Sequence, residues 1–177
     1  PSIFRDYFDI EEHGRMLAQT AGEMGLKKLV FIREEGDSCE AAHQALLRET
    51  KVLGISVLSV LEFHTGESDF KPLLLRAKSK KPDAYAFCAW RDTQVLITQL
   101  LGLGLLEKPS LHILAPFLPE ADTPEFRKIY EEHEVISTWY GFAQGTGTKK
   151  NQDFVEKFKK RYQREPRPDA AYAYDGL

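Results

Sequence analysis

The sequence contains no long hydrophobic run and no excess of charge of one sign. Its longest apolar stretches, such as Val95 to Leu106, are interrupted by polar residues and glycines and fall short of the ~20 residues that a membrane-spanning helix needs. The 24 Lys and Arg residues against 27 Asp and Glu residues give a formal net charge of −3, and 42% of the residues are hydrophobic. These values exclude a membrane span and an extended disordered chain within the 177 residues, and they argue against a nucleic-acid partner.

Cysteine is scarce. The two cysteines, Cys39 and Cys88, have no CxxC spacing, and Cys88 falls inside an apolar segment expected to form a buried strand. We therefore expect two structural thiols and no disulfide framework. Cys39 lies near the expected start of a helix, a position typical of reactive thiols, but no histidine or second cysteine is adjacent to it in the sequence. We expect no redox role.

The common catalytic and cofactor motifs are missing as well. There is no GxSxG nucleophile elbow and no P-loop. The stretch Gly102-Leu103-Gly104 follows a helix rather than a strand and lacks the third glycine of a dinucleotide-binding turn. The histidines, which show neither HxxxH nor HExxH spacing, are His13, His43, His64, His112 and His133. We expect a protein that is not an enzyme and that holds no cofactor and no metal ion.

Short apolar runs alternate with amphipathic segments along the chain. The run from Leu29 to Ile32, rich in β-branched and aromatic residues, is typical of a strand covered on both faces. The expected strands are 29–32, 55–63, 84–90, 111–115 and 134–138. The expected helices are 10–24, 38–53, 69–80, 92–103, 123–132 and a last one with Phe154, Val155, Phe158 and Tyr162 on one side. This alternation predicts an α/β, doubly wound fold with a mostly parallel five-stranded sheet and helices on both faces.

The ends of the chain indicate a piece excised from a longer protein. Pro1 is not an initiator residue, and the last residues stop inside a helical pattern. Residues 1–165 are predicted to form a single α/β ligand-binding lobe. Pro166-Arg167-Pro168 then breaks the chain, and 166–177 are predicted to be a hinge crossing and the start of a helix that belongs to a second lobe. No signal peptide is visible, which leaves the compartment open.

The carboxyl ends of the expected strands carry the candidate site, because loops and helix N-termini converge there in an open parallel sheet. Aromatic residues follow three of the four strand ends considered, and Arg91 can form a bidentate pair with an anion. The candidate ligand-binding residues are Asp37, Ser38, Trp90, Arg91, Pro116, Phe117 and Tyr140. Aromatic walls beside an arginine favour an aromatic or apolar carboxylate as the ligand.

Other interpretations of these residues remain open. Trp90 is also consistent with a cap on the sheet core, and Arg91 with a surface ion pair. A different function is open too, because a flavodoxin-like phospho-receiver or magnesium-dependent module would use the carboxylates of Glu34, Glu35 and Asp37 at the same edge. A receiver also needs an aspartate at the end of the third strand, where this chain has Trp90.

Several short sequence motifs, taken with their order and spacing, resemble those of a known family. They are Phe4-Arg5, Gly66-Glu67-Ser68-Asp69-Phe70, Lys81-Pro82-Asp83-Ala84, Thr123-Pro124-Glu125-Phe126 and Tyr174-Asp175-Gly176. Together they resemble one lobe of the type I periplasmic binding proteins, the leucine/isoleucine/valine-type substrate-binding proteins of ABC transporters. In that family Phe-Arg marks the arrival of the chain in the second lobe, and the Tyr-Asp phrase marks its return.

The resemblance implies an extracytoplasmic solute-binding protein of which this chain forms half of a cleft. Hinge motion would close the cleft on a small molecule, typically an amino acid, and the closed form would dock on a membrane permease. The alternative is the ligand-sensing domain of a membrane receptor, and in either case the location is periplasmic or extracellular.

The resemblance also assigns roles within the cleft. The family position after Asp37 is usually aromatic, and here it is Ser38. Trp90 matches a position that is often Tyr and that lines the cleft. Members that bind amino acids place a carboxylate near position 116, where this chain has Pro116-Phe117, so an α-amino acid ligand is not indicated.

Overall fold

The computed structural model describes two separate parts of the chain. The described residues are 9–89, 93–114, 124, 128–129, 132–133, 135–138, 148–166 and 170. By its internal contacts the chain divides into one compact unit of residues 9–139 and another of residues 1–8 with 140–177. The predicted division into a lobe of 1–165 and a hinge segment of 166–177 stays a prediction. No helix in the described segments is long and apolar enough to cross a membrane.

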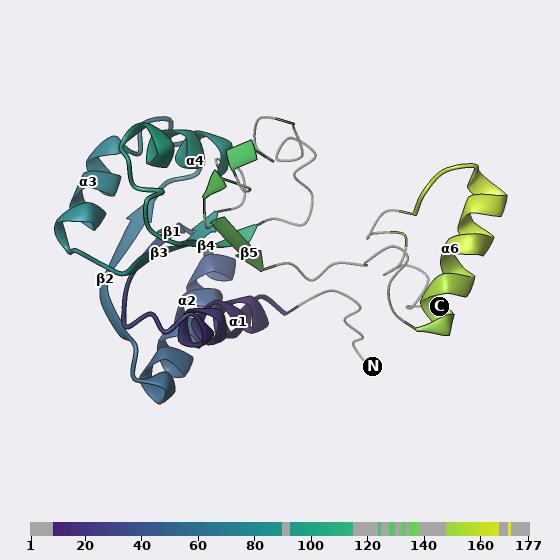
Figure 1. Ribbon diagram of the computed structural model, residues 1–177, viewed down its shortest axis with the longest axis horizontal. Helices are drawn as coiled ribbons and strands as arrows, with labels where there is room; N and C mark the ends of the chain where they lie inside the picture. The colour runs from purple at the N-terminus through teal and green to yellow at the C-terminus, as the bar shows by residue number, and fades with distance from the viewer. Residues whose placement is uncertain are drawn as a thin grey trace. The chain divides into compact units, whose positions relative to one another are not determined.

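Five parallel strands form the sheet of the larger unit (Figure 1). They are β1 (Lys28–Glu34), β2 (Ser56–Phe63), β3 (Ala84–Ala89), β4 (Ser110–Leu114) and β5 (Val135–Thr138). Their order is β2-β1-β3-β4-β5, and every neighbouring pair is parallel. The predicted five-stranded parallel sheet is confirmed. The chain leaves β1 toward β2 on one side and later returns to place β3 on the other side, so the strand order reverses between β1 and β3.

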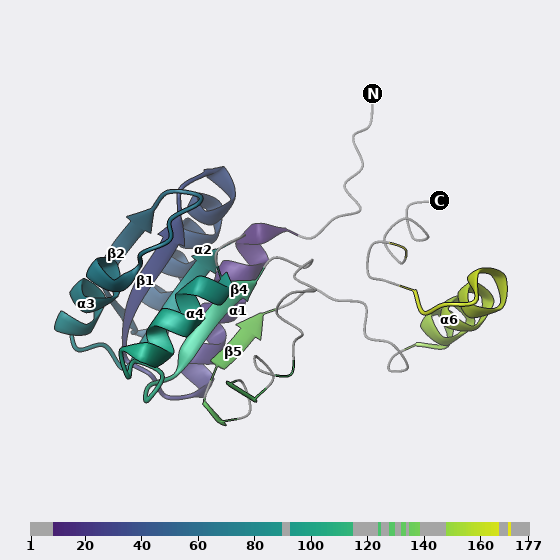
Figure 2. The same cartoon turned by 90° about the horizontal axis from the view of Figure 1, so that it is seen from above.

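Helices cover both faces of this sheet, as predicted (Figures 1 and 2). Helices α1 (Ile10–Glu23) and α2 (Asp37–Leu53) supply Leu17 and Leu46 to the apolar cluster that contains Leu29 and Phe31 of β1. Helices α3 (Lys71–Ser79) and α4 (Thr93–Gly102) pack on the opposite cluster with Val30 and Ile32. Alternate residues of one strand enter different cores because successive side chains point to opposite faces.

The smaller unit contains α6 (Lys149–Tyr162), the last helix predicted from the sequence. Thr148 caps it by accepting a hydrogen bond from the backbone N–H of Asn151 at 3.4 Å. Phe154, Phe158 and Tyr162 follow one another along one side, with ring centroids 5.8 Å and 4.6 Å apart. The expected helix at 123–132 and the expected hinge segment lie for the most part outside the described residues.

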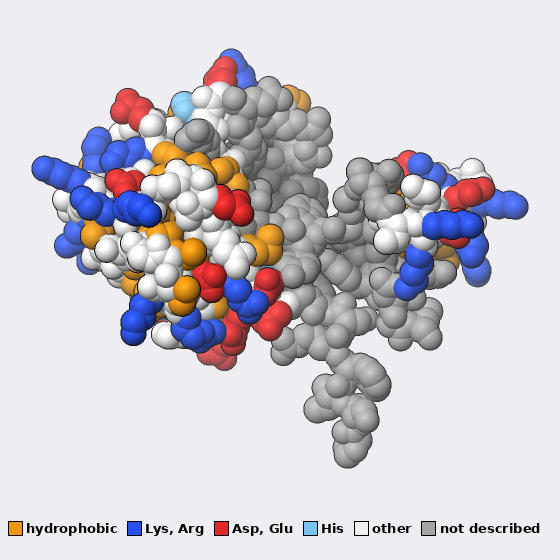
Figure 3. Space-filling view, turned by 60° about the horizontal axis from the view of Figure 1, so that its bottom comes forward, with side chains coloured by type: hydrophobic (Ala, Val, Ile, Leu, Met, Phe, Trp, Pro, Cys, Tyr) orange, Lys and Arg blue, Asp and Glu red, His pale blue; other side chains and the backbone are white. Residues whose placement is uncertain are grey.

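On the face shown in Figure 3, Lys and Arg side chains are interspersed with Asp and Glu, and hydrophobic side chains form small groups between them. Mixed charge of this kind agrees with the small net charge of the chain. This face does not present the single-sign field that steers polyanions.

Gly14 sets the approach of α1 to α2. A Cβ added at Gly14 would lie 2.0 Å from the carbonyl oxygen of Ala42 and 2.8 Å from its carbonyl carbon. Both atoms belong to the backbone of a helix and cannot move aside as a side chain can. A Cβ added at Gly22, in the same helix, would meet only side chains, with Leu53 at 3.4 Å and Ile55 at 4.0 Å as its nearest contacts.

We expect Gly14→Ala to lower the free energy of unfolding by about 1–3 kcal/mol, because α1 must shift away from α2. Gly22→Ala is the matched control, and it should raise stability by about 0.5–1 kcal/mol through helix propensity. Urea unfolding followed by circular dichroism measures both. Equal effects of the two substitutions would contradict the close approach at Gly14.

Tyr85 lies at the start of β3 on the α3 and α4 side of the sheet, and it is 1% exposed. Its ring is tilted against Phe87, with centroids 6.5 Å apart. Burial raises the pKa of the Tyr85 phenol above its ordinary value. Above pH ~10 the unfolded chain therefore loses this proton while the folded chain keeps it, and the folded state loses stability as pH rises.

We expect alkaline unfolding to be steeper in the wild type than in Tyr85→Phe, which keeps the ring but cannot ionise. Below pH 9 the two proteins should have similar pH dependence. The measurement is the urea midpoint between pH 8 and 11. Parallel curves for the two proteins over the whole range would show that Tyr85 does not control this dependence.

Candidate functional site

The first strand leads directly into the candidate site. β1 ends at Glu34, and after Glu35 and Gly36 the helix α2 begins at Asp37. Gly36 is the N-cap with φ +130°, a backbone region that favours glycine, and no side chain caps the helix. Asp37 and Ser38, both predicted as ligand-binding residues, are exposed in this uncapped first turn. Their binding role remains a prediction.

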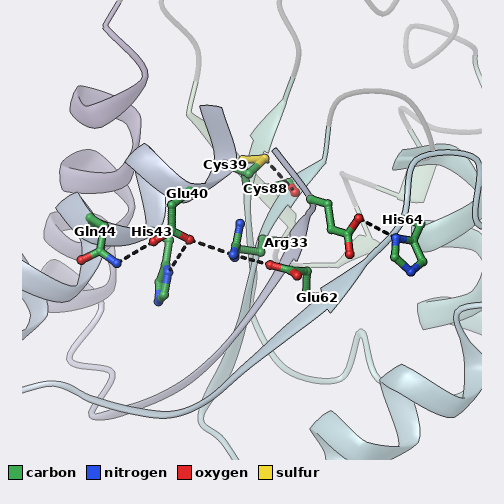
Figure 4. Close-up of polar contacts among 9 residues, drawn as sticks. Arg33, Cys39, Glu40, His43, Gln44, Glu62, His64 and Cys88 are labelled. Atoms are coloured by element: carbon green, nitrogen blue, oxygen red, sulfur yellow. Dashed lines mark hydrogen bonds and ion pairs between the residues drawn. A yellow bond between two sulfur atoms is a disulfide. The ribbon is translucent and has the colours of Figure 1, made fainter. Parts of the chain in front are cut away.

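The next residue, Cys39, forms a disulfide with Cys88 of β3, and the prediction of two free thiols is wrong (Figure 4). The two Cα atoms are 5.6 Å apart, and both side chains are buried. Spacing along the sequence could not show this proximity. It arises because β1 and β3 are neighbours in the sheet, so the residues that begin α2 lie beside the end of β3.

The disulfide connects two predicted parts of the site. Cys39 directly follows Ser38, and Cys88 precedes Trp90 by two residues. The bond also lies where the strand order reverses, between β1 and β3. In open α/β sheets this is the point where connections diverge and leave a crevice for ligands.

A charged network adjoins the disulfide. Arg33 on β1 is in register with Cys88 of β3 on one side and with Glu62 of β2 on the other. Its Nη2 lies 2.7 Å from Oε2 of Glu40 in α2, and the same nitrogen pairs with Glu62. The Arg33 side chain is 14% exposed. Figure 4 shows the guanidinium between the two carboxylates, so that Arg33 links α2 to β1 and to the edge strand β2.

Glu40 stays ionised within this network. The pKa of its carboxyl group is lowered from the ordinary value, first by a hydrogen bond from the side-chain amide of Gln44 at 2.7 Å, and further by the nearby charge of Arg33. Partial burial acts in the opposite direction. One turn along α2, the buried His43 ring stacks on Phe31 with centroids 5.5 Å apart.

Two of the three carboxylates of the magnesium alternative contact other side chains. Glu34 is buried and accepts a hydrogen bond from the hydroxyl of Thr65, and Glu35 contacts His64 in an exposed pair. Within the described segments, no group of three or more His, Cys, Asp or Glu side chains is placed to hold a metal ion.

The other predicted site residues lie outside the described residues. They are Trp90, Arg91, Pro116, Phe117 and Tyr140. The strands that precede them end at Ala89, Leu114 and Thr138, on the same edge of the sheet as Glu34, because all five strands run parallel. Their role in binding therefore stays a prediction.

Sequence reasoning missed Arg33, Glu40 and Glu62. A signal for one of them is present, since Arg33 directly follows the apolar run of β1 and is largely buried in the sheet layer. A charged residue at the end of a buried strand needs a partner, although the sequence does not say which.

Comparison with known proteins identifies the class. A periplasmic binding protein family model matches residues 4–177. No curated protein sequence matches the chain. Among solved structures, it is similar to an R. palustris ABC transporter solute-binding protein in complex with 4-hydroxybenzoate, with 19% identity and a TM-score of 0.77. That match covers 97% of this chain and 47% of the other.

Two further structures give the same result. An R. palustris solute-binding protein in complex with benzoate has 19% identity and a TM-score of 0.74, over 98% of this chain and 47% of that one. A leucine-binding protein from Thermotoga maritima MSB8 has 25% identity and a TM-score of 0.71. That match covers 96% of this chain and 47% of the leucine-binding protein. The chain thus spans about half the length of these proteins. It belongs to the periplasmic binding protein family.

We expect reduction of Cys39–Cys88 to lower the free energy of unfolding by about 4 kcal/mol, because the bond closes a loop with a sequence separation of 49 residues. The double variant Cys39→Ser/Cys88→Ser should show the same loss. Urea midpoints with and without reductant measure it, after peptide mapping under non-reducing conditions has identified the linked pair. Reductant that leaves the wild-type midpoint unchanged would contradict the bond.

Proposed function

We propose that the chain forms one half of the small-molecule cleft of an extracytoplasmic solute-binding protein of an ABC transporter. The observation that carries this proposal is that almost the whole chain matches only half of related solute-binding proteins. A second lobe would supply the facing half, and hinge motion would close the two on the ligand. The described carboxyl edge of the sheet, with its exposed α2 terminus, is the face that such a cleft requires.

The ligand we propose is an aromatic or apolar carboxylate. Ser38 and the free amides at the start of α2 would donate hydrogen bonds to the carboxylate, with Arg91 as its counter-ion and Asp37 beside them. The walls of the cleft would be Trp90, Pro116, Phe117 and Tyr140. Two similar proteins, in complex with benzoate and 4-hydroxybenzoate, support this ligand class.

The location and the partner follow from the same proposal. A disulfide in the core of the lobe is typical of an oxidising compartment, which supports the periplasm or the cell exterior. The closed protein would dock on a membrane permease, or signal through a membrane receptor if the lobe belongs to a sensor. Its work is binding, and we propose no catalytic step.

We expect benzoate or 4-hydroxybenzoate to raise the melting temperature of the protein carrying both lobes by several degrees. A ligand present at 100 times its dissociation constant stabilises by about 2.7 kcal/mol, which a thermal-shift assay detects. Trp90→Ala should abolish the shift. Tyr162→Ala, which removes a half-exposed aromatic residue of α6, should leave it unchanged.

Three outcomes separate the alternatives. A shift with leucine or isoleucine and none with the benzoates would refute the ligand class and keep the solute-binding function. A shift with Mg²⁺ alone would refute that function and return attention to Glu34, Glu35 and Asp37. Full binding by Trp90→Ala would refute the proposed aromatic wall.

A further inference from the structure

The start of α2 lacks the side-chain cap that α1 and α6 have. Asp9 accepts a hydrogen bond from the backbone N–H of Glu11 at the start of α1, at 3.0 Å, and Thr148 caps α6 in the same way. The N-cap of α2 is Gly36, which has no side chain to offer. An uncapped first turn tends to fray, because its amide groups have no partner within the helix.

Two tertiary links hold this turn instead. Cys39 is joined to Cys88 of β3 by the disulfide, and Glu40 is joined to Arg33 of β1 by an ion pair of 2.7 Å. The two residues are adjacent in sequence, so their side chains leave the helix about 100° apart. One link alone would let the helix end turn about it. Two links to different strands fix both its position and its rotation.

The sheet side of these links is itself constrained. Cys88 is fully buried, and Arg33 is held from the other side by Glu62 of β2. The pair with Glu62 therefore restrains the guanidinium from following Glu40 if the helix moves away. This arrangement makes the sheet the fixed partner and the first turn of α2 the segment that is being held.

We propose that Cys39–Cys88 and the Arg33–Glu40 pair are positioning elements that hold Ser38 and the first-turn amides of α2 in the arrangement that binds ligand. This inference rests on the proposed function, because it assigns the links a role at that same cleft. The disulfide has a second effect, since it ties the Ser38 segment to the strand that leads into Trp90.

The expected effect on binding follows from the population of the competent state. The apparent dissociation constant equals the intrinsic constant divided by the fraction of protein in which the site is arranged for binding. If loss of the disulfide reduces that fraction to about one tenth, the affinity falls about tenfold. The second link limits the effect, because Arg33 still holds Glu40.

The first experiment needs no ligand. Amide hydrogen exchange is measured across residues 37–41 in the oxidised protein, in the reduced protein and in Cys39→Ser/Cys88→Ser. The amide of Glu40, which donates to the carbonyl of Gly36 at 3.0 Å, should exchange at least about tenfold faster without the disulfide. Leu74→Ala is the control, because it lowers global stability and so speeds exchange in β1 as well, but it should leave the protection of Glu40 unchanged. Unchanged protection at 37–41 without the disulfide, or an equal loss of protection there in Leu74→Ala, would overturn the positioning role.

The second experiment measures affinity by calorimetry with the benzoate that gives the thermal shift, on the protein carrying both lobes. The double cysteine variant should bind about tenfold more weakly, well below its melting temperature. Leu74→Ala is the control for stability loss, because it removes a buried side chain from the opposite apolar cluster. It should bind as the wild type does.

A matched pair of charge variants tests the second link. Glu40→Gln weakens the pair at the first turn of α2, whereas Glu11→Gln weakens a pair of α1 with Arg48, farther along α2. Only Glu40→Gln should reduce affinity. Equal affinity of the oxidised and reduced proteins would overturn the inference. If no solute binds even the oxidised protein, the proposed function fails, and the exchange experiment still decides the positioning role.

Discussion

Burial of β1 on both faces and along both edges is the constraint on which the rest of the structure depends. Residues 29–32 are fully buried, with Phe31 in one apolar cluster and Ile32 in the other. The chain can bury both faces only by sending helices to both sides. Because right-handed crossovers in opposite directions lie on opposite faces, α2 covers one face while α3 and α4 cover the other. The reversal of strand order beside β1 follows from the same requirement.

The reversal of strand order creates the candidate site, which includes a helix end without a side-chain cap. The connections after β1 and β3 diverge, which leaves the crevice in which α/β proteins bind ligands. The helix α2 begins there with Asp37 and Ser38 exposed and without a side-chain cap. The disulfide and the Arg33 network cross this point and join the start of α2 to β1, β2 and β3. In the two-lobe protein that we propose, such links would keep this lobe rigid during hinge motion.

The similar proteins share the scaffold of this chain, whereas their ligands differ. Proteins with only 19–25% identity share the fold over almost the whole chain, and the ligands in their names range from leucine to benzoate. The common core is set by apolar period and burial, which many sequences satisfy. Ligand choice in such proteins depends on a few side chains at the strand ends. The fold therefore positions the ligand site but does not determine which ligand binds there.

The sequence by itself determined the elements of this protein. Apolar runs and helical periods predicted the five strands, their parallel arrangement and the helices of both faces, because burial leaves a local period of two or about 3.6 residues. It also placed Asp37 and Ser38 at a strand end. Only the tertiary structure decided which distant residues meet: Cys39 with Cys88, Arg33 with Glu40 and Glu62, and Gly14 with the Ala42 backbone. These contacts depend on strand order and helix approach, which leave no period in the sequence and are settled only when the whole core packs.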